Sequence, residues 1–197
     1  MRLEARQEAH SKARPVVLVI DETVLRLFPP LHASWSKRGS QSHVGVIGQN
    51  ARRVIFGAIN IRTGHRIIRI ASSQKQHEFQ EFLRDLRCRY RERPLCLLLD
   101  AHGSHTAPAT VAVAKDLGIR LLWLPKQSPE LNAMDHLWRH LKRRIATNRQ
   151  YGSIDEEAEA ARAWVMSLPA TTALRLVGIT SKNYWLRRFS QNFLGHT

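Results

Sequence analysis

Three aspartates occupy positions suited to binding metal ions. Asp21 directly follows an apolar run at residues 16–20, and Asp100 directly follows a second apolar run at residues 95–99. Runs of this length and composition predict strands buried on both faces. In open α/β sheets, ligands bind at the carboxyl ends of such strands, so two neighbouring strands would bring Asp21 and Asp100 to one edge of a sheet.

The third carboxylate, Asp135, lies in a predicted helix that we expect Pro129 to open. Arg139, Lys142 and Arg143 follow it at i+4, i+7 and i+8, so the four side chains share one helix face, and the cations could track a phosphate backbone. Three carboxylates suit magnesium, which binds few of them and completes its shell with water and phosphate oxygens. Two such ions would support in-line displacement at a phosphodiester.

The charge of the chain favours a polyanionic partner. Its 31 Lys and Arg residues against 16 Asp and Glu residues give a formal net charge of +15. Nucleic acid is favoured over a membrane surface, because no long basic amphipathic helix with a wide apolar face is visible. Further candidate DNA-binding residues lie in the two most basic stretches: Arg149, Lys182, Arg187 and Arg188.

The remaining composition indicates a soluble globular protein. The chain is 43% hydrophobic and 24% charged, without an apolar run near the roughly 18 residues of a membrane-spanning helix. The first 14 residues lack the apolar stretch of a secretory signal, and the two cysteines lack the spacing of a metal site. We therefore expect a cytoplasmic location.

The order of predicted elements favours an α/β domain. After the strand at 16–20, residues 22–51 predict a long irregular excursion, followed by a hairpin at 53–71 and a helix at 76–91. The strand at 95–99, a helix at 106–117 and a strand at 119–124 follow, and then the helix of Asp135 and a last helix capped by Ser153. We expect a lead-in at 1–14, a catalytic domain at 15–150 and a C-terminal helical extension at 151–197.

Several blocks of the sequence resemble the DDE-type endonuclease domain of mariner-type transposases, in the branch found in bacterial insertion sequences. VVLVIDE is similar to the family's first acidic strand, FGAINIRTGHRI to its next two strands, and LLLDAHGSH to its second acidic strand. The most specific block is WLPKQSPELNAMDHLWRHLKRR, which carries the third acid. The resemblance extends from about residue 15 to residue 160.

This resemblance implies a ribonuclease H-like fold with a mixed five-stranded sheet, and cut-and-paste movement of an element with inverted repeats. Asp21, Asp100 and Asp135 would bind two Mg²⁺ or Mn²⁺ ions. Three further residues would shape the site without binding the ions: Glu22, His105 and Asn132. Asp stands at 135 where many bacterial relatives carry Glu, and Ala101 stands where asparagine often follows the second acid.

The resemblance also implies partners: double-stranded DNA at the element ends and the target, and a second copy of the chain. Only 20 residues precede Asp21, whereas full-length relatives carry helix-turn-helix modules there, so we expect sequence-specific recognition of the element ends to be missing from this chain. Two explanations stay open: a split or frameshifted gene, in which a separate polypeptide carries these modules, and a truncated copy.

The sequence also allows other functions. One is a stand-alone ribonuclease H-like nuclease that only hydrolyses, and another is a non-catalytic DNA-binding remnant. His102 and His105 also suggest zinc, but no second pair at ligand spacing follows, so we expect them to line the acidic site instead.

Overall fold

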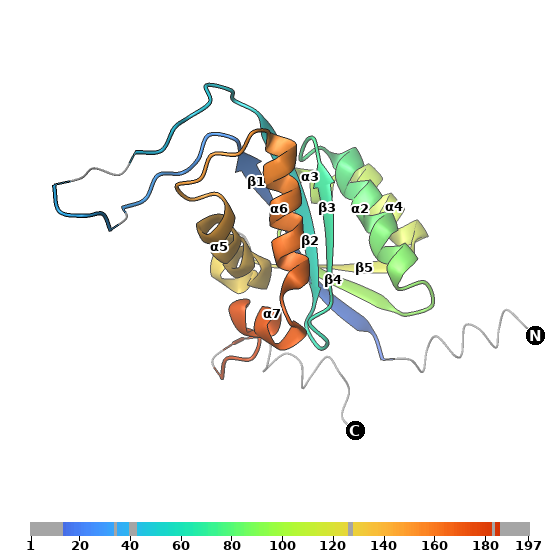
Figure 1. Ribbon diagram of the computed structural model, residues 1–197. Coiled ribbons are helices and arrows are strands. Elements are labelled where there is room, and N and C mark those ends of the chain that lie inside the picture. Colours follow the sequence, from blue (N-terminus) through green and yellow to red (C-terminus); the bar gives the residue numbers. More distant parts are fainter. Residues whose placement is uncertain (1–13, 34, 40–42, 126–127, 183, 186–197) are drawn as a thin grey trace, which may run out of the picture.

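The protein, described from a computed structural model, forms one mixed sheet in the strand order β3-β2-β1-β4-β5 (Figure 1). The structure describes residues 14–33, 35–39, 43–125, 128–182 and 184–185. β1 pairs antiparallel with β2 and β2 antiparallel with β3, whereas β1, β4 and β5 run parallel. The strands are β1 (Val16–Arg26), β2 (Arg52–Asn60), β3 (Arg66–Ala71), β4 (Leu95–Leu99) and β5 (Ile119–Trp123).

Helices cover both faces of the sheet, so the molecule has three layers (Figure 1). One apolar core lies beneath α2 (Gln76–Arg89) and α4 (Pro108–Asp116). The other lies beneath α5 (Ala133–Ile145), α6 (Ile154–Ser167) and α7 (Ala170–Leu176). Because side chains alternate along a strand, Leu18 packs in the first core and Val19 in the second.

The first strand is longer than predicted. We expected residues from 22 onwards to be irregular, but β1 continues through Glu22 to Arg26, so Asp21 lies within the strand and not after it. The reason is the partner strand: β4 pairs only with residues 16–19 of β1, whereas β2 continues beside it to the Arg26–Arg52 pair. The second acid, Asp100, does follow its strand as predicted.

Two helix predictions also needed correction. The helix expected at 106–117 is present as α4 but begins only at Pro108, and a separate single turn, α3 (Gly103–Thr106), precedes it, with Ala107 in a non-helical conformation between them. Proline disfavours a helical conformation of the residue before it, and Pro108 follows this break. Pro129 begins only a short 3-10 turn, η1 (Pro129–Leu131), and α5 starts at Ala133 with Asn132 as its N-cap.

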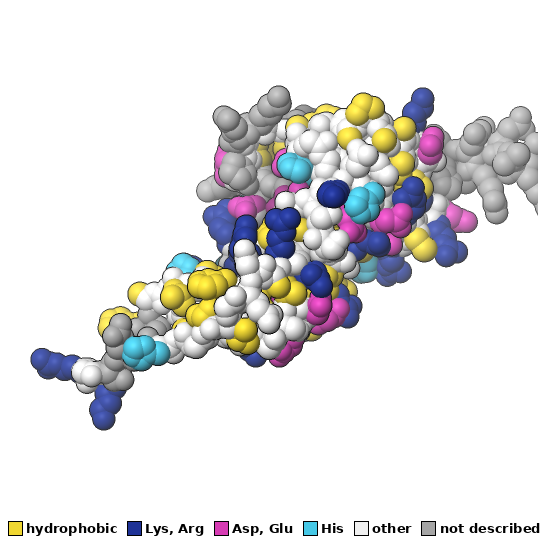
Figure 2. All heavy atoms as spheres, turned by 90° about the horizontal axis from the view of Figure 1, so that it is seen from above, with side chains coloured by type: hydrophobic (Ala, Val, Ile, Leu, Met, Phe, Trp, Pro, Cys, Tyr) yellow, Lys and Arg dark blue, Asp and Glu magenta, His cyan; other side chains and the backbone are white. Residues whose placement is uncertain are grey.

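The predicted irregular excursion is confirmed for the described residues from 27 to 51, which extend away from the body (Figure 1). Its base is fixed by Asn148, whose side chain accepts a hydrogen bond from the His32 backbone N–H and donates one to the His32 carbonyl, both at 2.9 Å. Figure 2 shows apolar side chains gathered on this projecting segment. Its exposed large apolar residues are Phe28, Leu31, Trp35, Val46 and Ile47.

The helices after residue 150 share a core with the rest of the fold. Ile154, Ala158 and Val165 of α6 are buried in the same cluster as Leu137 and Leu141 of α5. Of the capping box predicted at the start of α6, the Ser153 N-cap is confirmed, because its hydroxyl accepts from the Glu156 N–H at 3.1 Å. The Glu156 carboxylate accepts from the Gly152 N–H, at 3.0 Å, and not from that of Ser153. The division of the chain at residue 150 stays a prediction. Among the described residues, no helix is long and apolar enough to cross a membrane.

Candidate active site

The pairing of β1 with its neighbours sets the direction of the first two acids. Val19 of β1 is level with Leu98 of β4, so continuing this parallel register brings Asp21 level with Asp100. On the other side Asp21 is paired with Gly57 of β2, and directly paired residues project to the same face of a sheet. The atoms above Gly57 belong to Trp138 and Met134, so Asp21 projects towards α5.

The third acid is carried by that same helix. Asp135 lies in the first turn of α5, next to Met134, which is buried against the sheet. Arg139 donates to Asp135 Oδ2 from Nε at 3.1 Å and from Nη2 at 2.8 Å. Because both bonds reach the same oxygen, they orient the carboxylate without using Oδ1.

Neighbouring carboxylates change the pKa of Asp21. Burial, and then repulsion by Glu22, Asp100 and Asp135, raises the pKa of Asp21 to about 8. Asp100 differs: its hydrogen bond with His105 holds its pKa below the usual range. A partly buried carboxylate that is repelled by three others is stable in its ionised form only with cations nearby. Asp21, Asp100 and Asp135 therefore fit a divalent ion such as magnesium, whose ligands are oxygens.

Asn132 joins the helix of the third acid to the strand of the first. Its side-chain oxygen accepts from the Met134 N–H at 3.1 Å, which caps α5, and its Nδ2 donates to the Ile20 carbonyl at 3.2 Å. Asn132 is buried. One side chain thus fixes the start of α5, two residues before Asp135, to the residue that precedes Asp21. The role for Asn132 behind the ligands is an expectation that these contacts support.

A residue that the sequence analysis missed allows α5 to come so close. A Cβ atom at Gly57 would lie 2.5 Å and 2.6 Å from two carbons of the Trp138 ring and 2.7 Å from Met134 Cε. Only glycine leaves room for the helix directly beside Asp21. The signal was present in the sequence, because a lone glycine in a β-branched run often marks close approach by another element.

The opposite face of the sheet carries a second polar group. Glu22 follows Asp21 and therefore projects the other way, level with Phe56 and towards α2 and α3. There His105 Nδ1 lies 2.8 Å from Asp100 Oδ1, and His105 Nε2 lies 3.3 Å from Glu22 Oε2. Burial would lower the pKa of His105, but its hydrogen bond to Asp100 and the Glu22 carboxylate raise it to about 9.

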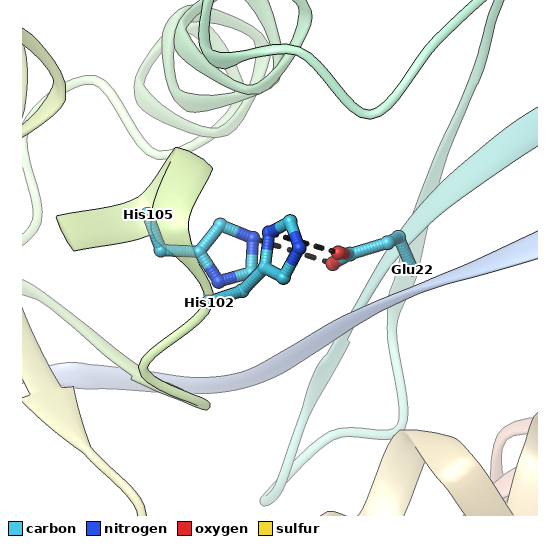
Figure 3. Close-up of side chains that lie close together, drawn as sticks. All are labelled: Glu22, His102 and His105. Carbon is cyan, nitrogen blue, oxygen red and sulfur yellow. Dashed lines mark ion pairs between the residues drawn. The ribbon is translucent and has the colours of Figure 1, made fainter. Parts of the chain in front are cut away.

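His105 is thus placed to orient Asp100. It is almost fully buried, and its ring lies 4.2 Å from the Phe79 ring, centroid to centroid. His102, which caps α3, lies nearby, with its ring 5.5 Å from that of His105 (Figure 3). The structure therefore brings the expected supporting residues to the acids from two sides: Asn132 on the α5 face, and Glu22 with His105 on the other.

The predicted DNA-binding residues are only partly grouped. Arg139, Lys142 and Arg143 are exposed on α5, as the helical spacing requires, although Arg139 is engaged by Asp135. Arg149 is exposed and lies over the Tyr151 ring at 4.6 Å. Lys182 is exposed after α7, and Arg187 and Arg188 lie outside the described residues. Seen from above, Lys and Arg side chains lie near the base of the projecting segment (Figure 2).

Comparison with known proteins identifies the family of the chain. Residues 16–156 match the family model described as DDE superfamily endonuclease. The chain is 29% identical over 136 residues to an uncharacterized 39 kDa protein of the insertion element IS630 from Shigella sonnei. The match covers 68% of this chain and 40% of that protein, so the chain spans less than half the length of this relative.

Solved structures share the fold. The mariner Mos1 paired end complex with Mg aligns over 99% of this chain and 60% of its own, with a TM-score of 0.68 and 16% identity. The Mos1 transposase catalytic domain with Raltegravir and Mg aligns over 100% of this chain and 92% of its own, with a TM-score of 0.62 and 13% identity. These matches confirm the predicted ribonuclease H-like fold. With a family model covering most of its length, the chain belongs to the DDE superfamily endonuclease family.

Proposed function

We propose that this chain is the catalytic part of a transposase, which cleaves DNA strands and transfers them during cut-and-paste movement of an insertion sequence. The observation that supports the proposal is that Asp21 and Asp100 are level on two neighbouring parallel strands, while Asp135 lies in the first turn of the helix that packs on the face to which Asp21 projects. The family and the insertion-element relative support the same reaction class.

Each acid has a distinct place in the proposed reaction. Asp21 and Asp100 are level at the sheet edge, and Asp135 approaches from α5 on the face to which Asp21 projects. The three carboxylates would hold two Mg²⁺ or Mn²⁺ ions, which supply charge neutralisation at the phosphate and activation of a water or a 3′ hydroxyl. His105 keeps Asp100 ionised and oriented, and Arg139 orients Asp135.

The partner in this proposal is double-stranded DNA. Lys142 and Arg143 lie beyond Asp135 on the exposed face of α5. DNA that lies along this helix with one phosphate at the acids would therefore place its next phosphates beside these two cations. Arg149 and Lys182 would extend this surface, and a high net charge of +15 supports binding of a polyanion. Solved relatives with this fold include a Mos1 transposase paired-end complex with the left transposon end.

We also propose two protein partners. A homodimer is supported by the exposed apolar side chains on the projecting segment 27–51, because contiguous apolar surface commonly marks a contact with another protein. A helix-turn-helix module, in this polypeptide or another, would recognise the element ends. Light scattering of the chain with and without end DNA tests the dimer.

Cleavage of labelled DNA is the direct test. The native chain, Asp100→Ala and the control Asp116→Ala would be compared on DNA carrying insertion-element ends, with magnesium, manganese or chelator. Asp116 is an exposed carboxylate at the end of α4, away from the sheet edge. We expect metal-dependent cutting and joining by the native chain and by Asp116→Ala, and neither by Asp100→Ala.

The other outcomes identify the rival functions. Cutting without joining of a 3′ hydroxyl end to a target would favour a hydrolytic ribonuclease H-like nuclease. Binding of DNA without cutting under any metal condition would favour a non-catalytic DNA-binding remnant and contradict the proposal.

A further inference from the structure

Two buried atoms near the acids face each other without a hydrogen bond. Glu22 Oε2 and His105 Nε2 are 3.3 Å apart, and neither has a hydrogen-bond partner among the residues that the structure describes. The Glu22 side chain is 7% exposed and that of His105 is 2% exposed, so bulk solvent does not reach these two atoms. Buried polar atoms normally have partners, so this pair needs an explanation.

A third ligand-bearing side chain points at the same place. His102 Nδ1 lies 3.9 Å from Glu22 Oε1, and Figure 3 shows both imidazole rings directed at the Glu22 carboxylate. One ligand atom from each of Glu22, His102 and His105 lies within 4.8 Å of the others. The His102 side chain is 47% exposed, which gives an ion a path from solvent.

The surroundings of His105 are those of a metal ligand. Histidine ligands usually donate their second ring N–H to a carboxylate, which fixes the ring and directs the other nitrogen at the ion. Here His105 Nδ1 is bonded to Asp100 Oδ1 at 2.8 Å, so Nε2 is the nitrogen directed at Glu22. A proton on His105 Nε2 could be shared only between His105 and Glu22. A metal ion could be bound by Glu22, His105 and also His102.

From this geometry we infer a transition-metal site formed by Glu22, His102 and His105, separate from the site of the three aspartates. Two imidazoles and one carboxylate with an open position favour zinc or a similar ion over magnesium, which prefers oxygen ligands. The two sites lie on opposite faces of β1, since Asp21 and Glu22 are adjacent in that strand. They are joined through the hydrogen bond between His105 and Asp100.

One existing contact has to change when the ion binds. Ser104 Oγ lies 2.8 Å from His102 Nδ1, and the Ser104 N–H lies 3.4 Å from it, so this nitrogen now caps α3. Ion binding through Nδ1 would replace these bonds. Because α3 is a single turn and His102 is partly exposed, the change is confined to the surface end of the site.

Zinc titration by calorimetry, in an excess of magnesium that saturates the aspartates, tests the site. We expect one zinc ion per native chain, and His102→Ala should weaken zinc binding by more than about 100-fold, since loss of an outer partner alone costs 10–100-fold. His77→Ala is the matched control, because His77 is exposed and lies 3.7 Å from the neighbouring Glu78, and no third ligand joins this pair among the residues that the structure describes. Asp135→Ala controls for zinc at the aspartates.

A spectroscopic measurement keeps the test independent of folding. Cobalt(II) in a site with two imidazoles and a carboxylate gives visible absorption bands, which we expect in the native chain, His77→Ala and Asp135→Ala, and not in His102→Ala or Glu22→Gln. Circular dichroism would show that these variants are folded. Equal zinc affinity of His102→Ala and the native chain, absence of zinc binding, or loss of zinc binding in Asp135→Ala would each overturn the inference.

Discussion

Replacing Gly57 with alanine would separate the third acid from the first two. The added methyl carbon would lie 2.5 Å and 2.6 Å from the Trp138 ring and 2.7 Å from Met134 Cε. Ordinary contacts between carbons are about 3.5–4.0 Å long, so α5 must move by about 1 Å. Met134 can bend away at its end, but the Trp138 ring is rigid and buried.

The expected costs follow from this displacement. Overpacking of a core typically costs about 1–3 kcal/mol, which leaves most of a domain stability of about 5–15 kcal/mol intact. A misplacement of about 1 Å at reacting groups can slow catalysis about 100-fold. We therefore expect Gly57→Ala to remain folded but to cleave DNA about 100-fold more slowly than the native chain.

Single-turnover cleavage and urea unfolding measure the two effects, and Trp138→Leu supplies the matched background. Because leucine lacks the ring atoms that meet the new methyl group, Gly57→Ala should cost less stability and less activity in the Trp138→Leu chain. Native cleavage and stability in Gly57→Ala, or equal costs in both backgrounds, would refute the reasoning that Gly57 sets the position of α5.

Three further predictions concern the buried polar groups. Burial raises the pKa of Glu157 from 4.5 to about 7, so its contribution to stability is present below pH 4.5 and is lost as the pH rises through 7. Glu157→Gln should therefore stabilise the fold at pH 8 by at most about 3 kcal/mol but not at pH 4, as urea unfolding at both values would show. Asn132→Ala should lose the α5 cap, at about 1 kcal/mol, and cleave more slowly than a control such as Ser153→Ala, which removes only the α6 cap. Because the pKa of Asp21 is about 8, metal binding at pH 7 should release a proton, and metal affinity should rise as the pH rises to 8. Calorimetry in two buffers of different ionisation enthalpy would detect the released proton. Metal binding without proton release would contradict the raised pKa.

The strands and the helix that carry the three acids could be predicted from sequence because they depend on local patterns. The apolar runs before Asp21 and Asp100 indicated two buried strands, and the structure pairs these strands in parallel. The helical spacing after Asp135 likewise predicted one exposed face for Lys142 and Arg143. These inferences need only the period of a strand or a helix.

The parts that were missed depend on contacts between distant segments. β1 extends past Asp21 because β2 pairs with it, and the polar residues at 22 and 23 gave no apolar run to indicate this. The role of Gly57 requires Trp138, which is far away in the chain, to lie above it. The link from Asp100 through His105 to Glu22 joins α3 to β1, so the sequence supplied these residues but not their geometry.

The central claim is that three aspartates from distant parts of the chain hold metal ions together. Manganese binding measured by electron paramagnetic resonance, in the native chain and in Asp21→Asn, Asp100→Asn, Asp135→Asn and the control Asp116→Asn, tests it most directly. We predict that each of the first three variants weakens manganese binding and abolishes DNA cleavage, whereas Asp116→Asn does neither. Native manganese affinity in any one of the three would show that its carboxylate lies outside the site and would contradict the account.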